Sequence, residues 1–133
     1  MDFPRLTARQ LFDIAADVEA YPSFIPWCRS AKITATDGDI RMVENHFGAG
    51  PVDLRFVTKA EATPPHRLII TSDDGPFRAF ALDWRFADGQ VRAEYRITLR
   101  SPLLQGLASL AMPEVERRII TQFRHRAAAL HEA

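Results

Sequence analysis

The sequence predicts an α+β fold in which a long C-terminal helix covers one antiparallel sheet. Three observations predict it: a helical pattern near the N-terminus, alternating apolar and polar residues between positions 29 and 100, and a second helical pattern over positions 103–130. The 133 residues are 47% hydrophobic and 26% charged, which suits one globular domain better than a disordered chain or a coiled coil. We therefore expect a single domain over residues 1–133.

A helix is predicted to begin at Thr7. The run Thr7-Ala-Arg-Gln10 matches a capping box, in which the threonine hydroxyl accepts from the third helical N–H and the glutamine reaches back to the cap. Apolar residues follow at helical spacing as far as Val18. Prolines at 22 and 26 then predict a helical turn that stops near Pro26. Residues 2–6 are a candidate seventh strand at the sheet edge.

Six strands fit the central region, because turn residues interrupt the alternation at five places. These are Asp37-Gly38, Gly48 to Pro51, Thr63 to Pro65, Asp73 to Pro76 and Ala87 to Gly89. The clearest strand has Val91, Ala93, Tyr95, Ile97 and Leu99 on one face, and Arg92, Glu94, Arg96, Thr98 and Arg100 on the other. Such alternation requires a sheet with one buried face and one wet face.

The last third is predicted to be one long helix. Its apolar stripe consists of Leu103, Leu107, Leu110, Ala111, Val115, Ile119, Ile120, Phe123, Ala127 and Leu130. Pro113 is expected to kink or split the helix, because proline in a helix interior costs about 3 kcal/mol. The arginines at 117, 118, 124 and 126 are interleaved with glutamates, which favours a solvated face over a nucleic-acid contact.

Charge and cysteine content exclude several classes of protein. Seventeen basic residues balance seventeen acidic ones, so the long-range attraction that DNA-binding proteins need is missing, and no DNA partner is expected. A single cysteine excludes an internal disulfide, which suits a reducing cytosol. The first residues lack the apolar stretch of a signal peptide, and no apolar run approaches the roughly 18 residues of a spanning helix. We expect a cytoplasmic protein of bacterial type.

No sequence motif points to catalysis, a metal or a cofactor. Hydrolase, metalloprotease, Walker and dinucleotide motifs are all missing, and the four histidines are scattered. Cys28 has no histidine near it in sequence and is expected to be an inert packing residue. An enzymatic alternative would need an acid or base inside the fold, such as Glu44, His46 or Arg55. The aromatic residues fit either a packed core or a ligand cavity, and composition alone favours the core.

The run from Leu11 to Cys28 ends in Tyr21-Pro-Ser-Phe-Ile-Pro-Trp-Cys28 and resembles the first helix and signature of the coenzyme Q-binding proteins of the START-like superfamily. That group includes the bacterial ribosome-association toxin, and its members are often labelled polyketide cyclase/dehydrase. Weaker matches follow in the same order: Pro64-Pro65, Asp74-Gly-Pro-Phe77, Trp84-Arg-Phe86 and Ser101-Pro-Leu-Leu104. The similarity runs from about Gln10 to Leu130.

This resemblance implies a helix-grip, Bet v 1-like fold: a curved six- to seven-stranded antiparallel sheet around the long C-terminal helix, with a hydrophobic tunnel between them. It implies a non-catalytic protein that carries ubiquinone or a similar isoprenoid lipid for respiration, with a transient contact to the inner-membrane surface. Two alternatives come with it, a toxin that blocks association of ribosomal subunits and a polyketide cyclase or aromatase. The chain departs from the family in its short segment before Thr7 and in Pro51, where a glycine-containing turn is usual.

Strand parity then predicts the walls of the tunnel. They are Phe24, Ile25 and Trp27 from the connector, Phe56, Phe80, Leu82, Trp84 and Tyr95 from the strands, and Met112, Val115 and Ile119 from the closing helix. The Tyr95 hydroxyl is the expected hydrogen-bond partner of a quinone carbonyl. A long isoprenoid tail gains about 0.8 kcal/mol per buried methylene and needs few polar anchors.

Overall fold

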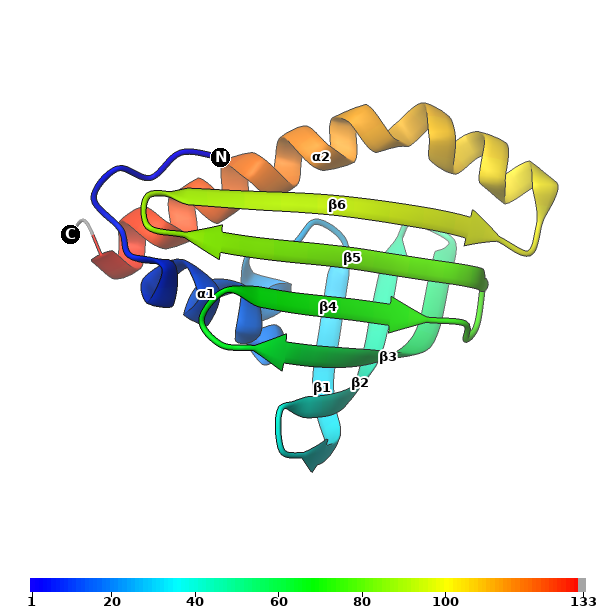
Figure 1. Ribbon diagram of the computed structural model, residues 1–133. Helices are drawn as coiled ribbons and strands as arrows, with labels where there is room; N and C mark the ends of the chain where they lie inside the picture. The colour runs from blue at the N-terminus through cyan, green and yellow to red at the C-terminus, as the bar shows by residue number, and fades with distance from the viewer. Residues whose placement is uncertain (132–133) are drawn as a thin grey trace.

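The computed structural model describes residues 1–131 and confirms the predicted fold class. Six strands form one antiparallel sheet in which each strand pairs with the next along the chain, and the long C-terminal helix crosses it (Figure 1). The elements are α1 (Ala8–Ala16), the 3₁₀ helix η1 (Val18–Ser23), β1 (Cys28–Asp37), β2 (Ile40–Ala49), β3 (Val52–Thr63), β4 (Arg67–Ser72), β5 (Phe77–Ala87), β6 (Gln90–Leu99) and α2 (Pro102–His131).

Helix α1 begins at the predicted capping box. The Thr7 hydroxyl accepts from the Gln10 N–H at 3.2 Å, and the Gln10 side chain accepts from the Thr7 N–H at 2.9 Å. A second cap comes from the turn between β5 and β6, where Asp88 Oδ1 accepts from the Ala8 N–H at 2.8 Å. Together these bonds hold the start of α1 against the end of the sheet.

The segment before α1 forms a single bridge, so the sheet has six strands rather than seven. Asp2 pairs with Gln90, and the Phe3 N–H donates to the Gly89 carbonyl at 2.7 Å. The chain turns away at Pro4 and Arg5. Since proline offers no N–H for a ladder, pairing stops after one bridge.

Alternation along the strands orients the sheet as predicted. Trp84 and Phe86 are buried while Arg85 between them is exposed. Trp84 lies opposite Ala93 and Leu82 opposite Tyr95, so these residues share the face that looks toward α2.

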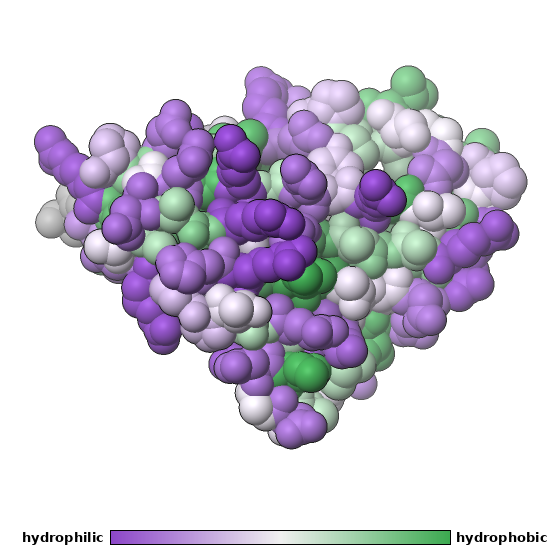
Figure 2. All heavy atoms as spheres, viewed as in Figure 1, coloured by the Kyte–Doolittle hydropathy of each residue, from purple (hydrophilic) through white to green (hydrophobic). Residues whose placement is uncertain are grey.

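Helix α2 is held to the rest of the fold mainly by its C-terminal half. Phe123 and Ala127 are its buried residues, and the Phe123 ring lies 5.6 Å from that of Trp84. The first half carries exposed leucines instead, and Figure 2 shows apolar side chains on the surface where α2 begins. Together with Phe3, α1 and η1, this arrangement puts the packed core at one end of the sheet.

Pro113 does not split α2, which is continuous from Pro102 to His131 and bows over the sheet in Figure 1. Pro113 and Ser109, the residue one turn before it, are both exposed. The Ser109 carbonyl that loses its helical donor can therefore be solvated, which keeps the helix intact.

Candidate ligand-binding site

A cavity of about 640 Å³ lies between the sheet and α2, beside the packed core. Apolar side chains of β2, β3, β5 and β6 line the sheet side, η1 contributes at one end, and α2 lines the opposite side. Its volume falls within the range of about 300–1,000 Å³ typical of small-molecule sites. Some aromatic residues of the sheet thus pack in the core, and others line the cavity.

Most of the predicted wall residues are brought together here. The structure places Ile25, Phe56, Phe80, Leu82, Trp84, Tyr95, Met112, Val115 and Ile119 on the cavity lining. Strand parity explains the agreement for the five strand residues, because alternate residues of neighbouring strands in register face the same side.

The predicted placement of Phe24 and Trp27 on the wall is corrected by the structure. Phe24 is in the core, where its ring lies 5.3 Å from Tyr21 and 6.4 Å from Phe123. Trp27 is 41% exposed, and the Arg118 guanidinium lies 5.4 Å from its ring centroid. Both belong to a connector without regular period, so no parity rule could orient them.

Sequence reasoning missed several lining residues of the first strands. Val43, Asn45 and Phe47 line the cavity from β2, and Leu54, Thr58 and Ala60 from β3. The signal was present in β2, where these residues alternate with Glu44 and His46. A lone asparagine in an apolar series is the kind of position where a ligand can be oriented.

The same alternation places the three candidate acid–base residues away from the cavity. Glu44, His46 and Arg55 are not among the residues that line it. His46 instead bonds Asp53, and this contact is the main cause of the lowered pKa of the Asp53 carboxyl. The titratable side chains on the lining are Tyr21 in η1 and Arg92, Glu94, Tyr95 and Glu116 where β6 meets α2.

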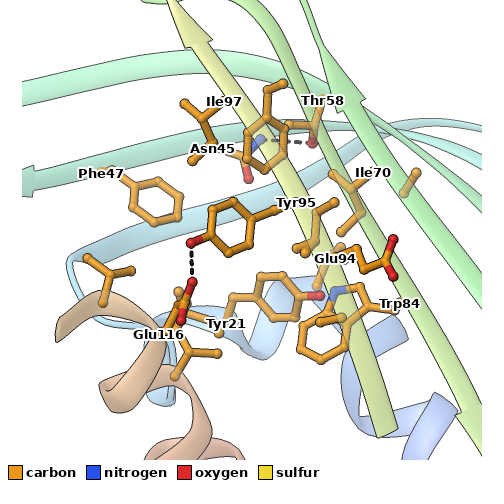
Figure 3. A pocket seen from close by; sticks show the side chains of 18 of the residues that line it. Tyr21, Asn45, Phe47, Thr58, Ile70, Trp84, Glu94, Tyr95, Ile97 and Glu116 are labelled. Atoms are coloured by element: carbon orange, nitrogen blue, oxygen red, sulfur yellow. Dashed lines mark hydrogen bonds between the residues drawn. The ribbon is translucent and has the colours of Figure 1, made fainter. Parts of the chain in front are cut away.

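Asn45 and Thr58 form a polar pair on the otherwise apolar sheet (Figure 3). The Asn45 Nδ2 donates to Thr58 Oγ1 at 3.0 Å, to the Val43 carbonyl at 3.1 Å and to the Phe56 carbonyl at 3.3 Å. Thr58 is only 5% exposed, so its hydroxyl is fixed by the surrounding side chains. The three hydrogen bonds of Asn45 Nδ2 then hold the Asn45 side chain in one orientation.

A second polar pair joins β6 to α2. The Tyr95 hydroxyl donates to the Glu116 carboxylate, and Figure 3 shows the two side chains meeting across the cavity. This hydrogen bond is the main cause of the raised pKa of Tyr95. Because the hydroxyl proton is directed to Glu116, it is not free to bond a quinone carbonyl as the sequence had predicted.

Two polar groups at the end of the cavity near α1, the Tyr21 hydroxyl and the Trp84 indole nitrogen, are buried. The Tyr21 hydroxyl donates to the Ala15 carbonyl, and burial raises the pKa of Tyr21 well above its usual range. The Trp84 Nε1 is buried and has no hydrogen-bond partner among residues 1–131.

Within this described part of the chain no cluster of His, Cys, Asp or Glu could hold a metal ion, and none of the helices is both long and apolar enough to cross a bilayer.

The profile of a family described as polyketide cyclase/dehydrase and lipid transport matches residues 5–124. The chain belongs to this family. Solved structures share its helix-grip fold: a crystal structure of TTHA0849 from Thermus thermophilus superposes with a TM-score of 0.80 at 16% identity, over 98% of this chain and 95% of that one. The Zhui aromatase/cyclase of Streptomyces sp. R1128 superposes with a TM-score of 0.77 at 12% identity, over 92% and 87% of the two chains.

Sequence relatives carry two kinds of name. The coenzyme Q-binding protein COQ10 homolog B, mitochondrial, of Xenopus laevis is 29% identical over 131 residues, which cover 92% of this chain and 54% of the relative. The ribosome association toxin RatA of Pseudomonas aeruginosa is 30% identical over 79 residues, covering 59% of this chain and 55% of the relative. The chain thus spans about half the length of the curated relatives it matches.

Proposed function

We propose that this member of the polyketide cyclase/dehydrase and lipid transport family is a non-catalytic carrier for a polyprenylated quinone of the ubiquinone type, in support of respiratory electron transport. The observation that carries the proposal is the cavity of about 640 Å³ with a mainly apolar lining. An isoprenoid tail in such a space gains about 0.8 kcal/mol per buried methylene. The name of the coenzyme Q-binding relative supports the same ligand class.

The proposal includes a transient contact with the surface of the inner membrane by a cytoplasmic protein. Leu103, Leu107 and Leu110 are 74%, 55% and 83% exposed, and their spacing places them along one face of α2. A helix face of this kind suits insertion into the interfacial region of a bilayer. Met112 and Val115, which line the cavity, follow Leu110 by two and five residues along the same helix, so the leucines would bring the cavity close to the bilayer surface.

Two experiments test the carrier proposal. Protein purified without detergent is extracted with organic solvent, and mass spectrometry is expected to find an isoprenoid quinone. Binding of decylubiquinone is then compared between Val115→Trp, which fills the cavity, and Val52→Trp, which places the same indole at a position that is 51% exposed and outside the lining. Loss of binding in the first variant only is expected. An empty protein that also fails to bind decylubiquinone would refute the proposal.

A second candidate is inhibition of ribosomal subunit association, favoured by the similarity to the toxin relative over 59% of the chain. It predicts that overexpression lowers the monosome peak in sucrose gradients, and that the protein co-sediments with one subunit in a salt-sensitive manner. The Val115→Trp variant separates the two functions, because a carrier loses activity in it while a surface-acting toxin retains activity. An unchanged monosome peak would rule out the toxin.

A further inference from the structure

We infer that the cavity selects a headgroup that donates hydrogen bonds, a hydroquinone or phenol, over the oxidised quinone, whose ring oxygens only accept. This rests on the proposed function and adds the redox state of the ligand to it. The inference comes from the polar atoms that the fold leaves facing the cavity, at Asn45 on the sheet and at Glu116 on α2. Both present acceptors.

The orientation of the Asn45 amide is set by its surroundings. Its nitrogen lies 3.1 Å from the Val43 carbonyl oxygen and 3.3 Å from that of Phe56, and both of these atoms can only accept. Turning the amide over would place its oxygen against two carbonyl oxygens. The nitrogen is therefore occupied, and the amide oxygen, which has no partner among residues 1–131, is the atom left for a ligand.

Glu116 makes the opposite side of the cavity an acceptor as well. Its carboxylate accepts a hydrogen bond from the Tyr95 hydroxyl. The remaining lone pairs of the carboxylate and those of the phenol oxygen are left for a ligand. The hydrogen bond to Glu116 raises the pKa of Tyr95, so the phenol keeps its proton and directs it to the carboxylate.

Two side-chain donors near the cavity are occupied or covered, and a third, the Thr58 hydroxyl, belongs to a residue that is only 5% exposed and already accepts from Asn45. The Tyr21 proton is bonded to the Ala15 carbonyl, and the Trp84 Nε1 lies beneath the surface. Arg92 also lines the cavity, but it is exposed and lies opposite the exposed Arg85 in the register, so its guanidinium is at the solvent-facing rim and away from Asn45. A quinone carbonyl placed against the Asn45 oxygen or the Glu116 carboxylate would face an acceptor and gain no hydrogen bond from it, whereas a hydroxyl would donate to either.

The test compares ligands that differ only in their capacity to donate. Decylubiquinone and decylubiquinol are measured by equilibrium dialysis under anaerobic conditions, together with 4-nonylphenol and its methyl ether as a pair without redox chemistry. The hydroxyl-bearing member of each pair is expected to bind about tenfold more tightly, the difference typical of one or two hydrogen bonds.

Two variants locate the selection. Asn45→Leu removes the acceptor on the sheet, and Glu116→Gln replaces an acceptor oxygen by an amide that can donate. Each is expected to reduce the preference toward about threefold, while the outer-face control Glu44→Gln retains it. Glu116 is exposed, so its variant keeps the test available should Asn45→Leu fail to fold.

The outcomes separate this inference from the carrier proposal. Equal binding within each pair, tighter binding of decylubiquinone, or a preference unchanged in Glu116→Gln would overturn the inference and leave the carrier intact. Failure of all four ligands to bind would refute the carrier, and the inference with it.

Discussion

Replacing Phe123 by alanine tests how α2 is held over the cavity. The Phe123 side chain is fully buried, and its ring lies 5.7 Å from Phe3, 6.4 Å from Phe24 and 5.6 Å from Trp84. Losing a phenyl ring from such a site removes its transfer free energy and leaves a hole between three rings, at a cost of about 3–5 kcal/mol. For a domain of this size the midpoint of thermal unfolding should fall by roughly 10–18 °C.

The matched control is Leu110→Ala on the same helix. Leu110 is 83% exposed, so its truncation should change the free energy of unfolding by less than about 0.5 kcal/mol. Urea unfolding followed by circular dichroism measures both variants against the native protein. Equal losses in the two variants, or a loss below about 1 kcal/mol for Phe123→Ala, would show that α2 is not anchored through its C-terminal half.

Three further predictions concern the cap of α1, the cysteine and one ion pair. Asp88→Ala should lower the free energy of unfolding by about 1 kcal/mol, because the Ala8 N–H loses its cap, and an unchanged urea midpoint would contradict this. Burial raises the pKa of the Cys28 thiol to about 11, so iodoacetamide should label it at pH 8 only after unfolding; rapid labelling of the native protein would disprove its inertness. Arg67 lowers the pKa of Asp83 in the folded state, so the ion pair contributes stability above the ordinary value of 3.8 and loses it as the pH falls through the lower folded value. Asp83→Asn should therefore be less stable than the native protein at pH 7 and approach it at pH 2 in thermal melts; a difference that does not change with pH would refute this.

Much of the site could be predicted from strand periodicity. In a strand alternate side chains face one side, so a pattern such as Leu82, Trp84 and Tyr95 predicts its shared face once the register is known. The connector has no such period, and the two aromatic residues assigned from it, Phe24 and Trp27, point elsewhere. The same periodicity could have found Asn45 on β2, but an isolated polar residue in a strand does not show whether a ligand or a neighbour satisfies it.

By itself the sequence determined the order of the elements, the capping box of α1, the one-sided sheet and the lack of motifs for standard cofactors, because these depend on local spacing and composition. Only the tertiary structure decided that the aromatic residues divide into a core around Phe123 and a hollow beside it. It also decided that the Tyr95 proton goes to Glu116, 21 positions away. Both outcomes depend on how closely α2 approaches the sheet along its length, a distance set by packing between segments far apart in the chain.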